Sequence, residues 1–314
     1  MRSQHFSHTA SDGAALEVYC WLPDDAATRA IQIIHGMAEH AGRYARFAQA
    51  LTDAGYAIFA QNLRGHGANA ALPGHYADNN GWQRVVADVH EIHDHIRAQF
   101  PRLPQALFGH SMGSFISQAC AAQFGKELDA VVLCATDKPP KPLLYGGLLA
   151  AWFERWRRGP RESSALLQKL SFGNFNQPFE SKSEPARTGF EWLSSDATEV
   201  DKYMHDPLCG FACSTETWCQ LLRAITQVQS RSSIQDIPAG LPVLLIAGSD
   251  DPVARFGKGP SALAAHYRRA GLSKVSTQFY ADCRHELLNE TARDHVTRDV
   301  LNWLNQHCRV DAKH

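Results

Sequence analysis

The sequence has no long hydrophobic run and no excess of charge of either sign. Its longest mostly apolar stretch, LLYGGLLAAWF at 143–153, is much shorter than the ~20 residues that cross a bilayer, which argues against a transmembrane helix. Lysine and arginine number 31 against 32 aspartates and glutamates, so no overall electric field would attract nucleic acid. We therefore expect a small or neutral binding partner and no nucleic acid.

Cysteine pairs of the CxxC type are also missing. The eight cysteines form no CxxC motif, and the first residues, MRSQHFSHTASDG, contain no apolar run of the kind that drives secretion. This pattern favours free thiols and a cytoplasmic protein. Internal repeats and heptad patterns are absent too, which argues against solenoids and coiled coils.

The sequence offers two weak metal patterns. HEIHDH at 90–95 differs from the His-Glu-any-any-His spacing of zinc proteases, and a helix with a polar, exposed face explains it. Cys209, Cys213 and Cys219 have no histidine beside them at zinc-ligand spacing. No phosphate-binding glycine loop is present either. We therefore expect neither a metal nor a cofactor.

Short apolar runs alternate with helix-like segments along most of the chain. Runs of this length, apolar through the middle, are typical of strands buried on both faces of a parallel sheet. The alternation predicts an α/β fold with a mostly parallel, doubly wound sheet. The segment 5–23 has a turn signal, SDG, and predicts an antiparallel hairpin at one edge. The expected strands lie at 30–36, 56–62, 105–111, 129–136, 241–249 and 274–280, and the expected helices at 44–55, 82–100, 114–125 and 292–308.

One long gap interrupts this rhythm between Thr136 and Leu241. The gap contains helix-like stretches such as SALLQKL and TWCQLLRAITQVQ and is broken by prolines. Because the strand pattern resumes afterwards, we interpret the gap as an inserted, mostly helical cap. The predicted organisation is a core of 1–137 and 237–314 with a cap at 138–236.

The motif GHSMG at 109–113 places Ser111 between two glycines, directly after an expected strand and before an expected helix. A turn this tight requires residues without bulk two positions before and after the serine. It exposes the hydroxyl at the carboxyl end of the sheet, where open α/β folds hold their active sites. An ordinary serine in a tight turn is the alternative. The context favours a nucleophile.

A nucleophilic serine needs an imidazole base, which a carboxylate holds in one tautomer. Both follow Ser111 in the order that this fold uses, with the acid after one late strand and the histidine after the next. His285 is the candidate base. Asp251 is the favoured acid because Pro252 fixes the turn behind it; Asp250 and, less favoured, Asp137 are the other candidates.

The reaction also needs hydrogen-bond donors for the oxyanion, and backbone N–H groups often supply them. The N–H of Met112, directly after the serine, is one candidate donor. The second is the N–H of Met37 in the loop HGMAEH at 35–40, where Gly36 allows a sharp turn. A purely structural turn is the alternative for this loop.

Five motifs in this order resemble the monoacylglycerol lipase and lysophospholipase branch of the α/β-hydrolase superfamily. The resemblance covers about residues 10–308 and is weakest in the cap. It implies a catalytic triad of Ser111, Asp251 and His285, with Met37 and Met112 as oxyanion donors. The motifs are HGMAEH at 35–40, LRGHG at 63–67, GHSMG at 109–113, GSDDP at 248–252 and RHELLNE at 284–290.

One position departs from the branch: Asn62 stands where the family often has aspartate, and we expect it to change loop hydrogen bonding more than chemistry. The resemblance also implies esters with one long acyl chain as substrates, taken under a mobile apolar cap. In that cap, 143–153 runs into ERWRR. This segment either contacts a membrane surface transiently or packs over the pocket as cap core.

The resulting expectation is a cofactor-free serine hydrolase that cleaves monoacylglycerol-like or lysophospholipid-like esters through an acyl-enzyme on Ser111. A short-chain carboxylesterase, a thioesterase or an aminopeptidase with the same triad are the alternatives. A non-catalytic protein of this fold is disfavoured, because such proteins usually lose a triad member. The oligomeric state is left open.

Overall fold

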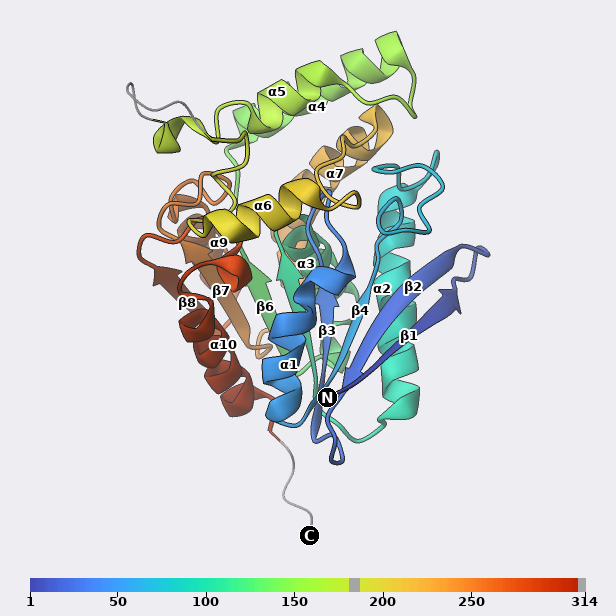
Figure 1. Ribbon diagram of the computed structural model, residues 1–314, viewed down its shortest axis with the longest axis vertical. Helices are drawn as coiled ribbons and strands as arrows, with labels where there is room; N and C mark the ends of the chain where they lie inside the picture. The colour runs from blue at the N-terminus through green and yellow to red at the C-terminus, as the bar shows by residue number, and fades with distance from the viewer. Residues whose placement is uncertain (181–186, 310–314) are drawn as a thin grey trace.

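The structure, a computed structural model, describes residues 1–180 and 187–309. In this part of the chain the strands form a single eight-stranded sheet with the order β1-β2-β4-β3-β5-β6-β7-β8 (Figure 1). β2 pairs antiparallel with both of its neighbours, β1 and β4, and all other neighbouring strands pair parallel. The strands are β1 (Arg2–Thr9), β2 (Ala15–Leu22), β3 (Arg29–Ile34), β4 (Tyr56–Gln61), β5 (Gln105–His110), β6 (Ala130–Cys134), β7 (Val243–Gly248) and β8 (Val275–Tyr280).

The central strands are the expected apolar runs, because layers of helices cover both of their faces. Every residue of β4, β5, β6 and β7 is buried. The expectation of burial on both faces is wrong for the run at 274–280. Its strand, β8, lies at the sheet edge, and Ser276, Thr277 and Phe279 are exposed. The predicted edge hairpin is present as β1 and β2, and Gly13 in its turn has φ of +85°.

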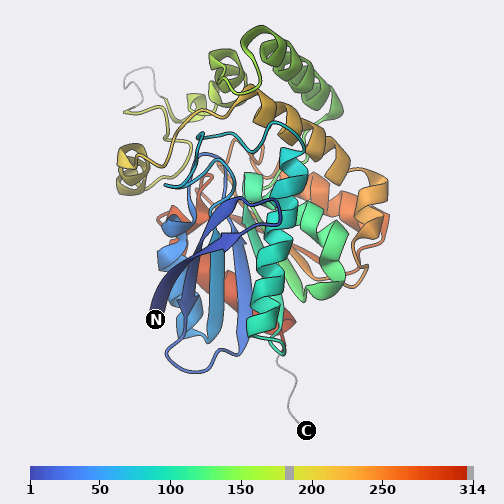
Figure 2. The same cartoon turned by 90° about the vertical axis from the view of Figure 1, so that its right-hand side faces the viewer.

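Helices cover both faces of the sheet, which confirms the predicted doubly wound α/β fold. The core cluster on one face includes side chains of α1 and α10, and the cluster on the other includes α2, α3, α7 and α9. Figure 2 shows these two layers from the side. The core helices are α1 (Ala45–Asp53), α2 (Gly81–Gln99), α3 (Met112–Phe124), α9 (Lys258–Ala270) and α10 (Arg293–His307). α9 was not among the predicted helices.

Between β6 and β7 the described residues form further helices. Figure 1 shows α4, α5 and α6 above the carboxyl ends of the parallel strands, while α7 descends towards the core and packs on α2 and α3. The cap boundaries at 138 and 236 stay a prediction, and 181–186 lie outside the described residues. These helices are α4 (Lys141–Arg158), α5 (Ala165–Phe172), α6 (Ala197–His205), α7 (Thr215–Val228) and α8 (Arg231–Asp236).

Helix α4 is amphipathic across its axis. Leu144 and Ala151 are buried on the side that faces α7, whereas Leu149 and Trp156 on the other side are 64% and 80% exposed. Among the described residues, no helix has both the length and the apolar character that crossing a bilayer requires.

Candidate active site

Ser111 lies at the junction between β5 and α3, in the tight turn that the motif predicts. Its φ and ψ are 50° and −116°, a backbone conformation that few non-glycine residues adopt. The N–H of Ser111 donates to the carbonyl of Cys134 over 2.9 Å, which anchors the turn to the end of β6. The serine is partly exposed and lines a cavity above the sheet.

The two glycines of the motif are required by the packing around the turn. A Cβ atom on Gly109 would lie 2.4 Å from the carbonyl oxygen of Gly113, and a Cβ atom on Gly113 would lie 2.1 Å from the carbonyl oxygen of Ile34. Both contacts are with backbone atoms, which cannot rotate away. The glycines therefore allow α3 to approach β3 and β5 closely enough to present Ser111.

The structure brings the candidate base and the favoured acid together. His285 Nδ1–H donates to Asp251 Oδ2 over 3.0 Å, and both side chains are almost completely buried. This bond leaves His285 Nε2 with its lone pair free. In the described part of the chain, Ser111 Oγ forms no hydrogen bond with His285, although both line the same cavity. Such a contact often tightens only when substrate is bound.

The other two candidate acids have different partners. Asp250 Oδ1 accepts a hydrogen bond from Ser249 Oγ over 2.9 Å. Asp137 Oδ1 accepts from Arg255 Nε over 2.8 Å, and burial is the main cause that raises the pKa of Asp137 to about 6. Neither carboxylate bonds to His285, so the geometry favours Asp251, as predicted.

The pKa of His285 reflects two opposed effects. Burial of the ring, the larger single effect, would lower the pKa, but the charge of Asp251 and its hydrogen bond, with further help from Glu286 and Glu39, raise it above its ordinary value. His110, whose ring centroid lies 4.8 Å from that of His285, behaves differently: burial lowers its pKa to about 4. His110 is therefore neutral, and His285 is the histidine able to take up a proton near neutral pH.

The loop 35–40 places its backbone N–H groups beside Ser111. Met37 lines the same cavity as the serine, and its N–H has no acceptor among the described residues. Met112 is the first residue of α3, where backbone N–H groups have no partner within the helix. Ala38, next to Met37, has φ of +54°, so the loop is held in an uncommon conformation.

Two buried histidines hold this loop in place. His35 Nε2 accepts a hydrogen bond from the N–H of Leu63 over 3.0 Å, and His66 Nε2 accepts from the N–H of Ala38 over 3.2 Å. Burial lowers the pKa of each to about 3, so both are neutral and able to accept. Their roles were not predicted, because each bond joins the motif at 35–40 to the motif at 63–67.

A buried ion-pair network lies beneath the loop. Glu39 accepts from the N–H of Gly36 over 2.6 Å and from Arg43 over 2.9 Å, and Arg43 also forms two 2.7 Å hydrogen bonds with Glu286. Burial alone would raise the pKa of Glu39 and Glu286, but Arg43 holds both below their usual range. The network connects the loop 35–40 to the residue after His285.

Asn62 lies outside the cavity and joins two other segments. Its Oδ1 accepts from the N–H of Ala41 over 2.8 Å, as an aspartate would, and its Nδ2 donates to Glu17 over 2.7 Å. An aspartate at 62 would instead place two carboxylates in contact. The amide thus supplies a donor that an aspartate lacks, and the expectation that it matters less for chemistry stays a prediction.

A cavity of about 610 Å³ extends from Ser111 under the helices between β6 and β7. Its volume lies within the ~300–1,000 Å³ range of small-molecule sites. Most of the lining is apolar and aromatic, with several polar side chains among it. The apolar lining includes Met37, Phe172, Phe190, Trp192, Leu193, Tyr203, Phe211 and Val253, and the polar lining includes Gln168, Lys169, Asn176, Glu180 and Thr188.

This fold and this site have counterparts among known proteins. The family described as "Serine aminopeptidase, S33" matches residues 25–292. The chain belongs to this family. It is 27% identical over 309 residues to a monoacylglycerol lipase of Mycolicibacterium smegmatis, covering 98% of each chain. It is 29% identical over 299 residues to a mouse monoglyceride lipase, covering 94% of this chain and 87% of that one.

A solved structure is also similar over the whole chain. The carboxyl esterase of Bacillus coagulans, solved in complex with glycerol, has a TM-score of 0.89 and 25% identity, with coverage of 98% of this chain and 100% of that one. Together these findings confirm the resemblance predicted from the five motifs, to the monoacylglycerol lipase branch of the α/β-hydrolases. They also support the predicted carboxylic ester hydrolase over the alternatives.

Proposed function

We propose that the protein hydrolyses esters that carry a single long acyl chain, of the monoacylglycerol type. The observation that carries the proposal is the convergence of Ser111, His285 and Asp251 at one end of a mostly apolar cavity. The similarity to monoacylglycerol lipases of a bacterium and of the mouse supports the same substrate class. A cytoplasmic location stays a prediction of the sequence.

The proposed reaction begins with attack of Ser111 Oγ on the ester carbonyl carbon. His285 Nε2 takes the hydroxyl proton, because its other nitrogen is held as Nδ1–H by Asp251. The N–H groups of Met37 and Met112 bind the oxyanion. Removal of one such donor from a serine protease costs about 10²–10³ in kcat.

Collapse of the tetrahedral intermediate breaks the ester C–O bond. The imidazolium of His285 gives its proton to the leaving alkoxide, and the alcohol departs while the acyl group stays on Ser111 Oγ. A water molecule then attacks the acyl-enzyme with His285 again as base, which releases the carboxylic acid and restores the serine.

The cavity lining supports an amphipathic substrate. The aromatic and aliphatic part of the wall provides a surface against which an acyl chain is removed from water, at about 25 cal/mol per Å² of apolar surface. Gln168 offers hydrogen-bonding groups suited to alcohol hydroxyls, whereas the side chains of Asn176 and Thr188 are already bonded to Glu191. A glycerol head group provides such hydroxyls, whereas a plain alkyl ester does not.

Initial hydrolysis rates on matched substrates test the proposal. We expect kcat/KM to rise with acyl length along a monoacylglycerol series. After correction for the better leaving group of p-nitrophenyl esters, kcat/KM for a monoacylglycerol should exceed kcat/KM for the p-nitrophenyl ester of the same acyl chain. Activity on all of these substrates should vanish in Ser111→Ala. Activity confined to short acyl chains would contradict the substrate class. Faster turnover of an acyl thioester or an aminoacyl amide would favour the thioesterase or aminopeptidase reading.

We also propose that α4 contacts a lipid surface from which the substrate is drawn. Its exposed apolar residues recur along one side of the helix, away from α7, and none of them lines the cavity. Arg157 and Arg158 follow at the end of the helix, but Arg157 is paired with Glu154 and Arg158 donates to the carbonyl of Ser163, so the apolar residues carry this proposal. The exposed residues are Leu143, Tyr145, Leu149, Trp152, Phe153 and Trp156.

The double variant Trp152→Gln, Trp156→Gln separates surface binding from catalysis. We expect weaker co-sedimentation with phosphatidylcholine–phosphatidylglycerol vesicles and slower hydrolysis of vesicle-borne monoacylglycerol, with unchanged hydrolysis of a water-soluble ester. The matched control is Leu72→Gln, an exposed apolar residue on another segment. Equal vesicle binding by the double variant and the wild type would refute the membrane role of α4.

A further inference from the structure

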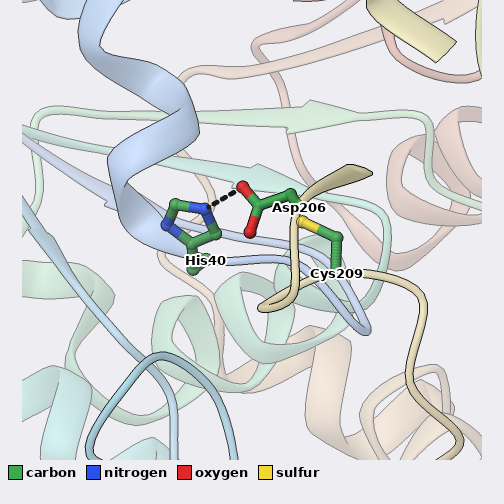
Figure 3. A group of neighbouring side chains, drawn as sticks. All are labelled: His40, Asp206 and Cys209. Carbon is green, nitrogen blue, oxygen red and sulfur yellow. Dashed lines mark hydrogen bonds and ion pairs between the residues drawn. The ribbon is translucent and has the colours of Figure 1, made fainter. Parts of the chain in front are cut away.

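Three side chains with metal-binding atoms meet where the segment after α6 crosses the loop 35–40. A ring nitrogen of His40, a carboxylate oxygen of Asp206 and the sulfur of Cys209 all lie within 4.8 Å of one another. Figure 3 shows the imidazole and the sulfur on two sides of the Asp206 carboxylate, with the hydrogen bond between His40 Nε2 and Asp206 Oδ2, 2.9 Å long. Sequence spacing gave no sign of this cluster, since the histidine lies far from the cysteine along the chain.

The backbone holds two of the three side chains at the ends of one tight turn. In the turn Asp206-Pro207-Leu208-Cys209, the N–H of Cys209 donates to the carbonyl of Asp206 over 3.0 Å, and proline at the second position favours such a turn. Asp206 Oδ1 accepts from the N–H of Leu208 over 2.9 Å, which leaves Oδ2 directed at His40. The turn thus fixes the carboxylate and the thiol on one side.

The third side chain is held against this turn by bonds to the loop that carries it. The carbonyl of Ala38 accepts from the N–H of Gly210 over 2.9 Å and from Tyr203 Oη over 3.0 Å. His40 follows two residues later, and its buried Nδ1 has no hydrogen-bond partner among the described residues. The bond to Asp206 Oδ2 places the ring proton on Nε2, and the unpartnered Nδ1 is the position to which this proton can move when Nε2 binds an ion.

The surrounding charge favours a cation. Near Cys209 lie the carboxylates of Glu39, Asp206 and Glu286 and the guanidinium of Arg43, and burial raises the pKa of the thiol, a cost that a bound cation has to offset. Three negative charges therefore face one positive charge. Side-chain exposure of 12% for His40 and 29% for Asp206 leaves a path for an ion from solvent.

We propose that His40, Asp206 and Cys209 form a binding site for a thiophilic divalent cation of the Zn²⁺ class. Imidazole, carboxylate and thiolate are all ligands of zinc, at about 2.0–2.3 Å, so a tetrahedral ion holds its ligand atoms roughly 3.3–3.7 Å apart. To reach this arrangement His40 Nε2 and Asp206 Oδ2, now 2.9 Å apart, must separate slightly, while all three atoms already lie within 4.8 Å of one another. Water fills the fourth position.

Binding replaces two protons at the ligand atoms. The thiol of Cys209 loses its proton to solvent, and the ring proton of His40 moves from Nε2 to Nδ1. The bound ion would join the segment after α6 to the loop that contains Met37. Apo and metal-bound protein therefore differ in how firmly these two segments are held together.

Cobalt(II) is the probe, because a cobalt–thiolate bond gives a sulfur-to-metal charge-transfer band in the near ultraviolet. We expect one equivalent of Co²⁺ to produce the band in the full-length protein, Zn²⁺ to displace it, and Cys209→Ser to abolish it. Asp206→Asn should weaken Co²⁺ binding at least tenfold. The matched control Cys219→Ser, which alters a cysteine of α7 outside the cluster, should keep the band.

A second group of side chains, His90, Asp94 and Glu127, also lies within 4.8 Å and has no sulfur. Metal bound to this second group gives no charge-transfer band. The variant His90→Asn disrupts the group, so equilibrium dialysis of this variant counts only the metal bound elsewhere. Absence of the band in the wild-type protein would overturn the proposal, with no variant needed. A band that persists in Cys209→Ser would also overturn it. Neither readout depends on ester hydrolysis, so the site and the proposed function fail separately.

Discussion

Replacement of Gly113 by alanine sets two effects of known size against each other. Gly113 lies in the first turn of α3, where alanine favours the helix by at most about 1 kcal/mol. Against this, the new Cβ would lie 2.1 Å from the carbonyl oxygen of Ile34 and 2.6 Å from that of His35. Contacts with a Cβ atom are essentially never shorter than 3.0 Å, so α3 and the end of β3 must separate by roughly 1 Å.

Overpacking of this kind costs about 1–3 kcal/mol, which exceeds the gain in helix propensity. We expect Gly113→Ala to lower the free energy of unfolding by that amount, measured by urea denaturation. The displaced atoms include the start of the loop that carries Met37. Since a 1 Å misplacement near the reacting atoms can cost about 10²-fold, kcat/KM should fall by a similar factor.

The control is Gly146→Ala, another helical glycine. A Cβ atom there meets nothing within 4 Å, and the residue is exposed on α4. We expect this variant to be as stable as the wild type or more stable by up to about 1 kcal/mol, with unchanged activity on a water-soluble ester. If Gly113→Ala matched Gly146→Ala in stability and activity, the packing argument for the motif would be refuted.

Three further outcomes follow from the site. Because the pKa of His285 is raised, kcat/KM should begin to fall at a pH above about 6.5 as the solution is made more acidic. Asp251→Asn should shift this fall to lower pH and reduce kcat by roughly 10⁴. An unchanged pH profile in the variant would exclude Asp251 as the partner of His285. Tyr203→Phe removes one of the two donors to the carbonyl of Ala38, worth about 1 kcal/mol, and should lower kcat about fivefold for a soluble ester. Asn62→Asp should lower the free energy of unfolding by about 1–3 kcal/mol at pH 8, because the new carboxylate contacts that of Glu17. The loss should be smaller at pH 5, where the two carboxylates can share a proton. Equal losses of unfolding free energy at both pH values would contradict this.

The sequence predicted the elements whose signal is local. Uniformly apolar runs predicted β3 to β7, because burial on both faces requires them. GHSMG predicted the turn at Ser111, since steric limits on its glycines act within five residues. Asp251 was preferred over Asp250 on the strength of one proline, and the hydrogen bond to His285 agrees with that choice.

Two elements were missed or misplaced although the chain carries local signals for them. α9 begins with Lys258-Gly259-Pro260, a combination that reads as a loop, but the following SALAAHYRRA is rich in helix formers, and a first helical turn tolerates proline. The run at 274–280 was grouped with the inner strands although Ser276, Thr277 and Gln278 lie at its centre, and these polar residues suit the edge position that β8 takes.

The support of the loop 35–40 was missed because it depends on residues far apart in the chain. His35 and His66 accept hydrogen bonds across 28 residues. His40 reaches Asp206 across 166 residues. No local spacing rule connects such pairs, so the folded chain was needed to find them.

Covalent labelling of Ser111 tests the central claim most directly. After reaction with a fluorophosphonate, intact-mass spectrometry should show a single adduct, and peptide mapping should place it on Ser111. The adduct should be absent from Ser111→Ala and slow to form in His285→Ala. An adduct of equal yield in Ser111→Ala, or hydrolysis of monoacylglycerol by that variant at the wild-type rate, would contradict the account.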